Sequence, residues 1–180
     1  MSELEIVRVV EVFEANHAAW ALVGAHAINL LTEPRATTDF DFVVEASKFV
    51  GVLDGLAVAF GDLGENDIGA AIQLKAIDVD LIRSTNHPLF HEALRDVRVI
   101  GEWKVPRTEV LIVLKFLSAV SPWRHRAKRI QDIGDITAIH GAAALDRATM
   151  IELSRLVYPG AEAEFGALLD HIDRGEPISI

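Results

Sequence analysis

The segment "PRATTDFDFVVE", residues 34–45, places two aspartates one position apart in an otherwise apolar stretch. Its aromatic and β-branched residues predict a β-strand over "TDFDFVVE". Side chains at i and i+2 of a strand point to the same face, so Asp39 and Asp41 are expected to project together. Two carboxylates this close repel each other, and burying them without a partner is costly. We interpret the pair as a platform for a cation.

Mg²⁺ (or Mn²⁺) is the cation that this donor set favours. It takes hard oxygen ligands and is commonly held by one or two carboxylates together with the phosphates of a substrate. The stretch "AIQLKAIDVDLIR", residues 71–83, predicts one strand or two strands joined by a bend, with Asp78 and Asp80 on the face opposite the apolar residues. Asp80 is the expected third carboxylate, either as a metal ligand or as a general base. Asp78 is the competing candidate.

A phosphate site is expected upstream of the aspartates. The strand "WALV" runs into Gly24 and Ala25 and then into a helix, and the free N–H groups at a helix N-terminus favour phosphate oxygens. Arg35 and Thr37 precede the aspartates and offer a guanidinium and a hydroxyl to the same region. Together these residues predict the binding of a nucleoside triphosphate.

Lys115 lies within the apolar run "VLIVLKFLSAV", where a charge is unexpected unless it reaches a partner. One interpretation is that it neutralises phosphate oxygens, and the other is that it extends its ammonium group into solvent. Downstream, Asp132 and Asp135 share a helical face, which suits either an ion pair with Arg129 or a place in an active site. These alternatives stay open from the sequence.

Composition narrows the class of protein. The chain has 180 residues, 51% of them hydrophobic, which is enough for a well-buried core. A net charge of −10 argues against broad, sequence-independent binding of nucleic acid. The lack of cysteine excludes disulfides and suits a cytoplasmic location. We expect neither a signal peptide nor a membrane partner, because no apolar stretch is long enough to span a bilayer.

The order of predicted elements is an α/β core over residues 1–106 followed by a helical lobe over 107–180 that packs on it. The core is expected to hold a mixed sheet flanked by helices, so the fold class is α/β (α+β). Within the core we predict helices over 3–15, after Gly24 and from Ser47 to Phe60, strands over 20–23, 38–45, 71–83 and 97–106, and a loop over 61–71. In the lobe we predict helices over 107–120, 125–139, 145–157 and 161–172.

The segment "PWRHRAKR", residues 122–129, holds the one concentration of positive charge. It predicts either a solvated helix face or a landing site for RNA or a triphosphate. The three tryptophans, Trp20, Trp103 and Trp123, are expected in the core or between the two parts of the chain.

These motifs resemble a known signature. "VGAHAINLLTEPRATTDFDFVV" is similar to the glycine-led segment and R-x-T-x-D-h-D motif of the polymerase-β-like nucleotidyltransferases, and most of all to that of the AbiEii/MenT-type toxins. "AIDVDLI" resembles the strand that carries that family's third carboxylate. "VLIVLKFLSAV" and "RAKRIQDIGDI" resemble its lysine helix and the acidic segment that follows. The resemblance covers roughly residues 18–138.

The resemblance implies a nucleotidyltransferase fold and the Mg²⁺-dependent transfer of NMP from an NTP to a hydroxyl. The acceptor would be an RNA 3′ end, a protein or a small molecule, and a toxin would have an antitoxin partner. By this likeness Asp39, Asp41 and Asp80 are the catalytic and metal-binding residues. Gly24, Ala25, Arg35, Thr37 and Lys115 then bind the nucleotide. The family's second glycine or serine is Ala25 here, so the alternative is a catalytically silent binding or regulatory module with this fold.

Overall fold

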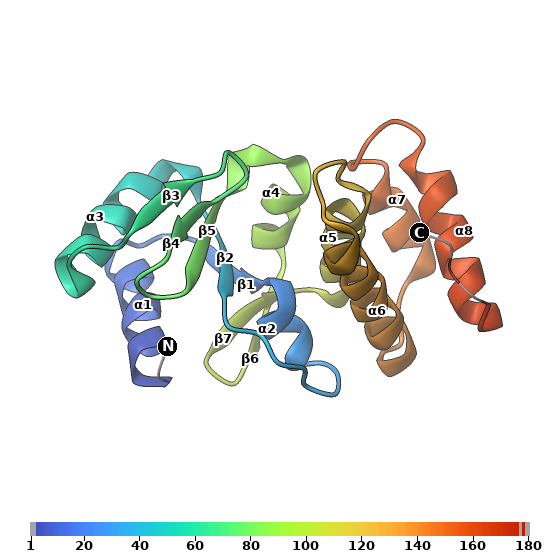
Figure 1. Cartoon of the computed structure of the whole chain (residues 1–180), viewed down its shortest axis with the longest axis horizontal. Coiled ribbons are helices and arrows are strands. Elements are labelled where there is room, and N and C mark those ends of the chain that lie inside the picture. Colours follow the sequence, from blue (N-terminus) through green and yellow to red (C-terminus); the bar gives the residue numbers. More distant parts are fainter. Residues whose placement is uncertain (1–2, 177, 179–180) are drawn as a thin grey trace. The chain divides into compact units, whose positions relative to one another are not determined.

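The computed structural model of the chain describes residues 3–176 and 178, and these form two compact units (Figure 1). The first unit contains Met1–Ala27 and Arg35–Pro106. The second contains Ile28–Pro34 and Arg107–Ile180. Residues 28–34, which begin near the end of the helix that starts at Gly24, thus belong to the second unit together with the C-terminal helices.

A five-stranded mixed sheet forms the centre of the first unit, as the sequence predicts. Its order is β1-β2-β5-β4-β3, and β2 and β5 are the parallel pair. The strands are β1 (Trp20–Val23), β2 (Phe40–Val44), β3 (Glu65–Asp67), β4 (Ile72–Leu74) and β5 (Val79–Arg83). The sheet is mixed, because β1 and β4 pair antiparallel with the two parallel strands. Together with the helices that flank it, this sheet makes an α+β fold.

Helices and a hairpin complete this unit. The helices are α1 (Glu3–Ala15), α2 (Gly24–Asn29), α3 (Phe49–Phe60) and α4 (Pro88–Arg95), with 3-10 turns η1 (Ala46–Lys48) and η2 (Ser84–Asn86). The segment expected as a final strand forms a separate hairpin of β6 (Val97–Ile100) and β7 (Trp103–Pro106). Ser47, where this helix was expected to begin, lies instead inside η1, and α3 begins two residues later.

An aromatic cluster fills the core between α1 and the sheet. Phe13 lies 5.1 Å from Phe42 and 5.7 Å from Trp20, measured between ring centroids, and all three side chains are fully buried. Phe42 is on β2 and Trp20 on β1, so the cluster joins the first two strands to the helix. The Phe13–Phe42 contact is edge-to-face, and a contact of this kind adds about 1 kcal/mol beyond the area it buries.

Two glycines of α3 allow it to approach α1 closely. A Cβ atom on Gly51 would lie 2.9 Å from Asn16 Oδ1, and one on Gly55 would lie 2.8 Å from Val12 Cγ1. The two glycines are four residues apart and therefore share one helix face. Their cost in helix propensity is offset by the packing of the two helices.

Two predictions about the strands were wrong. Residues 65–67 form the edge strand β3 inside the segment expected to be a loop, pairing with β4. Asp78 and Asp80 do not share a strand face, because a tight turn over residues 75–78 separates β4 from β5. Asp78 sits in that turn with a positive φ of 48°. A left-handed conformation is open to aspartate, which the alternating pattern does not reveal.

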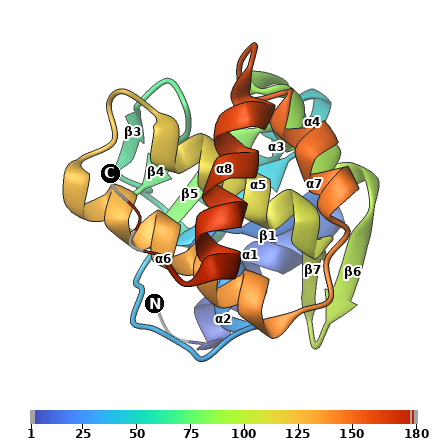
Figure 2. The same cartoon turned by 90° about the vertical axis from the view of Figure 1, so that its right-hand side faces the viewer.

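The second unit is helical (Figure 2), with α5 (Thr108–Val120), α6 (Arg126–Ala142), α7 (Arg147–Ser154) and α8 (Ala161–Arg174). Phe165 of α8 packs on Phe116 of α5, with ring centroids 4.9 Å apart. Each helix lies within a few residues of its predicted range. None of the helices in residues 3–176 has the length and apolar character needed to cross a membrane.

A buried ion-pair network joins α5 to α6. Lys115 Nζ lies 3.1 Å from Asp132 Oδ1 and 2.8 Å from Asp135 Oδ2. Arg124 donates to both oxygens of Asp132, through Nε at 2.8 Å and Nη2 at 3.1 Å. Lys115, Asp132 and Asp135 are all buried, so the charge inside the apolar run has its partners within the same unit.

The basic segment 122–129 divides into inward and outward residues. Arg124 is held by Asp132, and Arg129 donates to the carbonyl oxygen of Ser121. Arg126 and Lys128 are exposed on α6. Trp123 is 94% exposed, so it does not lie in the core. It lies in the connection between α5 and α6, and such connections mostly run over the protein surface.

Replacing Lys115 with methionine is expected to destabilise the protein by about 3–5 kcal/mol, because Asp132 and Asp135 would lose a buried cationic partner. Arg155→Met is the matched control, since it removes an exposed pair with Glu152 on α7. The control should cost less than about 1 kcal/mol. Urea unfolding of both variants measures the difference, and equal losses would show that the buried network does not stabilise the unit.

Candidate active site

Two carboxylates meet at the centre of the sheet. Asp41 on β2 and Asp80 on β5 are register partners across the parallel pair. Register partners in neighbouring strands lie on the same face of a sheet. Asp39 immediately precedes β2, is exposed, and accepts a hydrogen bond of 3.0 Å from Thr38 Oγ1. The first unit therefore holds all three predicted carboxylates, with Asp41 and Asp80 half-buried.

Asp41 and Asp80 begin a row of register partners across the sheet, and two amide side chains continue this row. Gln73 on β4 is the register partner of Asp80, and Asn66 on β3 is the partner of Gln73. Asn66 Nδ2 donates to Gln73 Oε1 at 2.9 Å, and Gln73 Nε2 donates to Asp80 Oδ2 at 3.4 Å. This chain of hydrogen bonds orients the Asp80 carboxylate. Sequence reasoning missed both amides, since their alignment depends on the register of the β4–β5 hairpin.

Burial raises the pKa of Asp80 above its ordinary value. The hydrogen bond from Gln73 works in the opposite direction, and the negative charge of Asp39 adds to the increase. Asp39 therefore lies close enough to Asp80 for its charge to act on that carboxyl. A carboxylate with a raised pKa is better suited to accept a proton near neutral pH than an ordinary surface aspartate.

Gly24 is held against Asp41. Its φ is +66°, and a Cβ atom there would lie 1.9 Å from Asp41 Oδ2 and 2.7 Å from Asp41 Cγ. No side chain can occupy that space. The contact follows from topology, because Val23, the last residue of β1, is the register partner of Asp41. The chain turns into α2 at the next residue, directly beside the carboxylate, and Ala25 is buried in the first turn.

His26 is a further residue at this site that sequence reasoning missed. Its ring stacks on Phe40 with centroids 3.6 Å apart and planes 6° apart. Burial lowers the pKa of His26, the charge of Asp39 opposes that decrease, and Arg35 adds to it. The ring is therefore mainly neutral at pH 7, and its buried Nε2 has no hydrogen-bond partner. Its position directly after Gly24 and Ala25 is the feature of the sequence that could have identified it as a site residue.

The remaining predicted residues divide between the units. Arg35 and Thr37 lie half-buried in the coil between α2 and β2, and Arg35 Nη1 donates to the carbonyl of Ala36 at 3.4 Å. Lys115 lies in the second unit, paired with Asp132 and Asp135. Those pairs explain its burial without a phosphate.

The carboxylates suit a divalent cation in chemistry. They are hard oxygen donors on or next to adjacent strands, and the pKa of Asp80 is raised first by burial and further by the charge of Asp39. In residues 3–176 and 178, no group of three or more histidine, aspartate or glutamate side chains is gathered closely enough to hold a metal by itself. The site therefore suits a cation that one or two carboxylates hold and whose remaining ligands are oxygen atoms of a substrate.

Comparison with known proteins finds similarity in fold but not in sequence. No protein-family model matches the chain, and no curated protein matches it in sequence. An antigenic nucleotidyltransferase-like protein from Paracoccidioides brasiliensis superposes with a TM-score of 0.62 at 20% identity, over 95% of this chain and 92% of that one. The chain has a nucleotidyltransferase fold. The fold implied by the resemblance is confirmed, whereas particular closeness to the AbiEii/MenT-type toxins stays a prediction.

Two structures of ANT(2'')-Ia agree with this relationship. The solution structure of this antibiotic-resistance factor gives a TM-score of 0.57 at 13% identity, covering 96% of this chain and 95% of that one. The crystal structure in complex with adenylyl-2''-tobramycin gives 0.58 at 14% identity, covering 90% and 95%. At such identities the backbone arrangement is shared, and the chemistry has to be argued from the residues of this chain.

Gly24→Ala is expected to destabilise the protein well beyond the cost of a positive φ. Gly101→Ala is the matched control, because Gly101 has a φ of +60° with open space around it. The control should cost about 1–2 kcal/mol for the left-handed conformation alone. Gly24→Ala should cost about 1–3 kcal/mol more, because Asp41 must move. Equal losses in denaturant unfolding would contradict the close contact.

Asp80→Asn is expected to raise the melting temperature at pH 7. Between the unfolded and the raised folded pKa of Asp80, the native state binds more protons than the unfolded state, so stability falls as pH rises. Asparagine removes this penalty, and its advantage should vanish as the pH is lowered to the unfolded pKa. Calorimetry at several pH values tests this, with Asp54→Asn on the exposed face of α3 as the control. A lower melting temperature for Asp80→Asn at pH 7 would contradict the raised pKa of Asp80 in the folded state.

Proposed function

We propose that the protein is a nucleotidyltransferase that moves NMP from an NTP to a hydroxyl acceptor with the help of Mg²⁺ or Mn²⁺. The observation that carries the proposal is the row in which Asp41 and Asp80 stand in register on the parallel strands, with Gly24 fitted against Asp41. The nucleotidyltransferase fold of the solved neighbours supports it.

In this proposal Asp39 and Asp41 hold the cation, and Asp80 completes the site or acts as general base. The cation, when bound, would neutralise the carboxylates and stabilise the charge that develops on the phosphate oxygens. Asp80 would accept the proton of the acceptor hydroxyl, a role that its raised pKa favours. Gln73 would keep the Asp80 carboxylate in position through its hydrogen bond.

The bonds exchanged are those at the α-phosphorus. The acceptor oxygen forms a bond to the α-phosphorus as its proton passes to Asp80. The bond from the α-phosphorus to the bridging oxygen breaks, and pyrophosphate leaves with that electron pair. Gly24 and Ala25 would offer backbone N–H groups to the triphosphate, and Arg35 and Thr37 would add a guanidinium and a hydroxyl. Lys115 would stabilise its own unit rather than contact phosphate.

The acceptor is proposed to be a small polyhydroxyl molecule rather than a long polyanion. The net charge of −10 repels RNA, and two of the four cations in the basic segment, Arg124 and Arg129, are turned inward. One solved neighbour is in complex with adenylyl-2''-tobramycin, a product in which a nucleotidyl group is joined to an aminoglycoside. An RNA 3′ end or a protein hydroxyl, with a toxin role and an antitoxin partner, remains the acceptor class favoured by the AbiEii/MenT resemblance alone.

A catalytically silent binding module is the second candidate. Ala25 lacks the hydroxyl that a serine would offer to phosphate, which is the observation that favours it. Calorimetry of the wild type with ATP, GTP, CTP and UTP in the presence of Mg²⁺ separates the candidates. Binding with turnover supports the enzyme, binding without turnover supports the module, and no binding counts against both.

Asp41→Asn is expected to lower the transfer of α-labelled NMP by about 100-fold or more, because an essential cation ligand is lost. Its melting temperature should be unchanged or higher, since repulsion between carboxylates is relieved. Asp78→Asn is the matched control, because asparagine tolerates the positive φ of that turn and Asp78 has no role in the proposed chemistry. The assay supplies each labelled NTP with an aminoglycoside mixture, total RNA or cell lysate. Transfer by Asp41→Asn at the wild-type rate would refute the proposal.

A further inference from the structure

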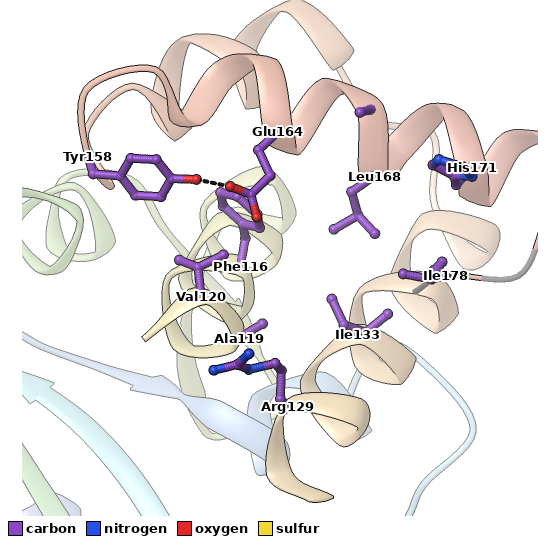
Figure 3. A pocket seen from close by; sticks show the side chains of 11 residues that line it. Phe116, Ala119, Val120, Arg129, Ile133, Tyr158, Glu164, Leu168, His171 and Ile178 are labelled. Atoms are coloured by element: carbon purple, nitrogen blue, oxygen red, sulfur yellow. Dashed lines mark hydrogen bonds between the residues drawn. The ribbon is translucent and has the colours of Figure 1, made fainter. Parts of the chain in front are cut away.

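The second unit contains a pocket of about 480 Å³ (Figure 3). Residues of α5, α6 and α8 line it, together with Tyr158 and Ile178. Its apolar walls include Phe116, Ile133 and Leu168. A volume of this size and a lining that combines apolar side chains with a few polar groups are typical of small-molecule sites. The pocket lies wholly within the helical unit, whereas the carboxylate row lies in the sheet of the first unit.

Arg129 is the polar group that marks this pocket. Its Nη2 donates to the Ser121 carbonyl at 3.3 Å, but its Nε is buried and has no hydrogen-bond partner. No carboxylate among residues 3–176 and 178 forms an ion pair with it, in contrast to Arg124, which Asp132 neutralises. The side chain as a whole is half-buried and lines the pocket, so its guanidinium places a positive charge there that can attract an anion.

The acidic side chain of the pocket is already engaged. The Tyr158 hydroxyl donates to Glu164, and Figure 3 shows this pair on the far side of the pocket from Arg129. Burial and the nearby Glu164 raise the pKa of Tyr158 to about 12, so its hydroxyl stays protonated at neutral pH. The Tyr158 hydroxyl is neutral, so its hydrogen bond does not neutralise the Glu164 carboxylate, and that end of the pocket disfavours an anion. The opposite end, where Arg129 has no ion pair with a carboxylate of the described residues, is the end complementary to an anion.

We propose that this pocket binds a small organic anion, with an apolar one- or two-ring body against Phe116, Ile133 and Leu168 and a carboxylate, sulfonate or phosphate group on Arg129. Charge-assisted hydrogen bonds from a guanidinium to such groups are strong because both partners are charged. The site does not depend on the nucleotidyl-transfer proposal, and its test does not use catalysis.

Fluorescence titration with anilinonaphthalene sulfonate, an aromatic anion, tests the site. The neutral N-phenylnaphthylamine serves as the comparison probe. The wild type is expected to bind the sulfonate probe at one saturable site, and Arg129→Met should weaken that binding about ten-fold or more. Binding of the neutral probe to Arg129→Met should change by less than about two-fold, because the apolar walls remain. Arg126→Met, which removes an exposed cation from the same helix, is the matched control and should bind both probes as the wild type does.

The outcomes are distinguishable. Near-UV circular dichroism and the melting temperature establish that each variant keeps the native packing. Ile133→Trp fills the apolar side of the pocket and should weaken both probes, which gives a second readout if Arg129→Met fails to fold. The proposal is overturned if the wild type shows no single-site binding, if Arg129→Met and Arg126→Met behave alike, or if Ile133→Trp leaves both probes unaffected.

Discussion

The contact between Gly24 and Asp41 is the constraint on which the candidate site depends. Register places Val23 beside Asp41, so the turn into α2 must pass over a carboxylate, and only a glycine with positive φ leaves room for it. On its other side, Asp41 stands in register with Asp80. One residue thus links the β1–α2 junction to the parallel pair at the centre of the sheet. Displacing Asp41 would disturb both the helix start and the second carboxylate.

The buried aspartates of the helical unit and the half-buried Asp80 of the sheet have opposite surroundings. Asp132 and Asp135 are neutralised by Lys115, and Asp132 also by Arg124, so their charges contribute to the packing of α5 on α6. Asp80 instead carries a raised pKa, to which burial and the charge of Asp39 both contribute. A cluster that is costly to keep charged in the folded state is more common at functional sites than at structural ones. The contrast within one chain supports a chemical role for Asp80 and its neighbours and a structural role for Asp132 and Asp135.

The elements that sequence reasoning predicted are those with a strong local signal. The strand of Asp39 and Asp41, the mixed sheet and the four C-terminal helices follow from side-chain periodicity, although β2 begins only at Phe40. The residues that it missed depend on partners far along the chain. Gln73 and Asn66 join the row only through the register of three strands, and Asp78 leaves it through a positive φ. Likewise the sequence marks Lys115 as unusual, but its carboxylate partners are known only once α5 and α6 are packed together.

Local charge matters more than net charge in judging what this protein could bind. A triphosphate is an anion, and a chain with a net charge of −10 would repel it at long range. The screening length of about 8 Å at physiological salt confines that repulsion to the approach, so the groups within the site decide the outcome. Arg35 and the backbone N–H groups at the start of α2 oppose Asp39, Asp41 and Asp80 there. These few positive groups leave a local excess of negative charge, so a nucleotide would bind there only together with a cation that both the phosphates and the aspartates share.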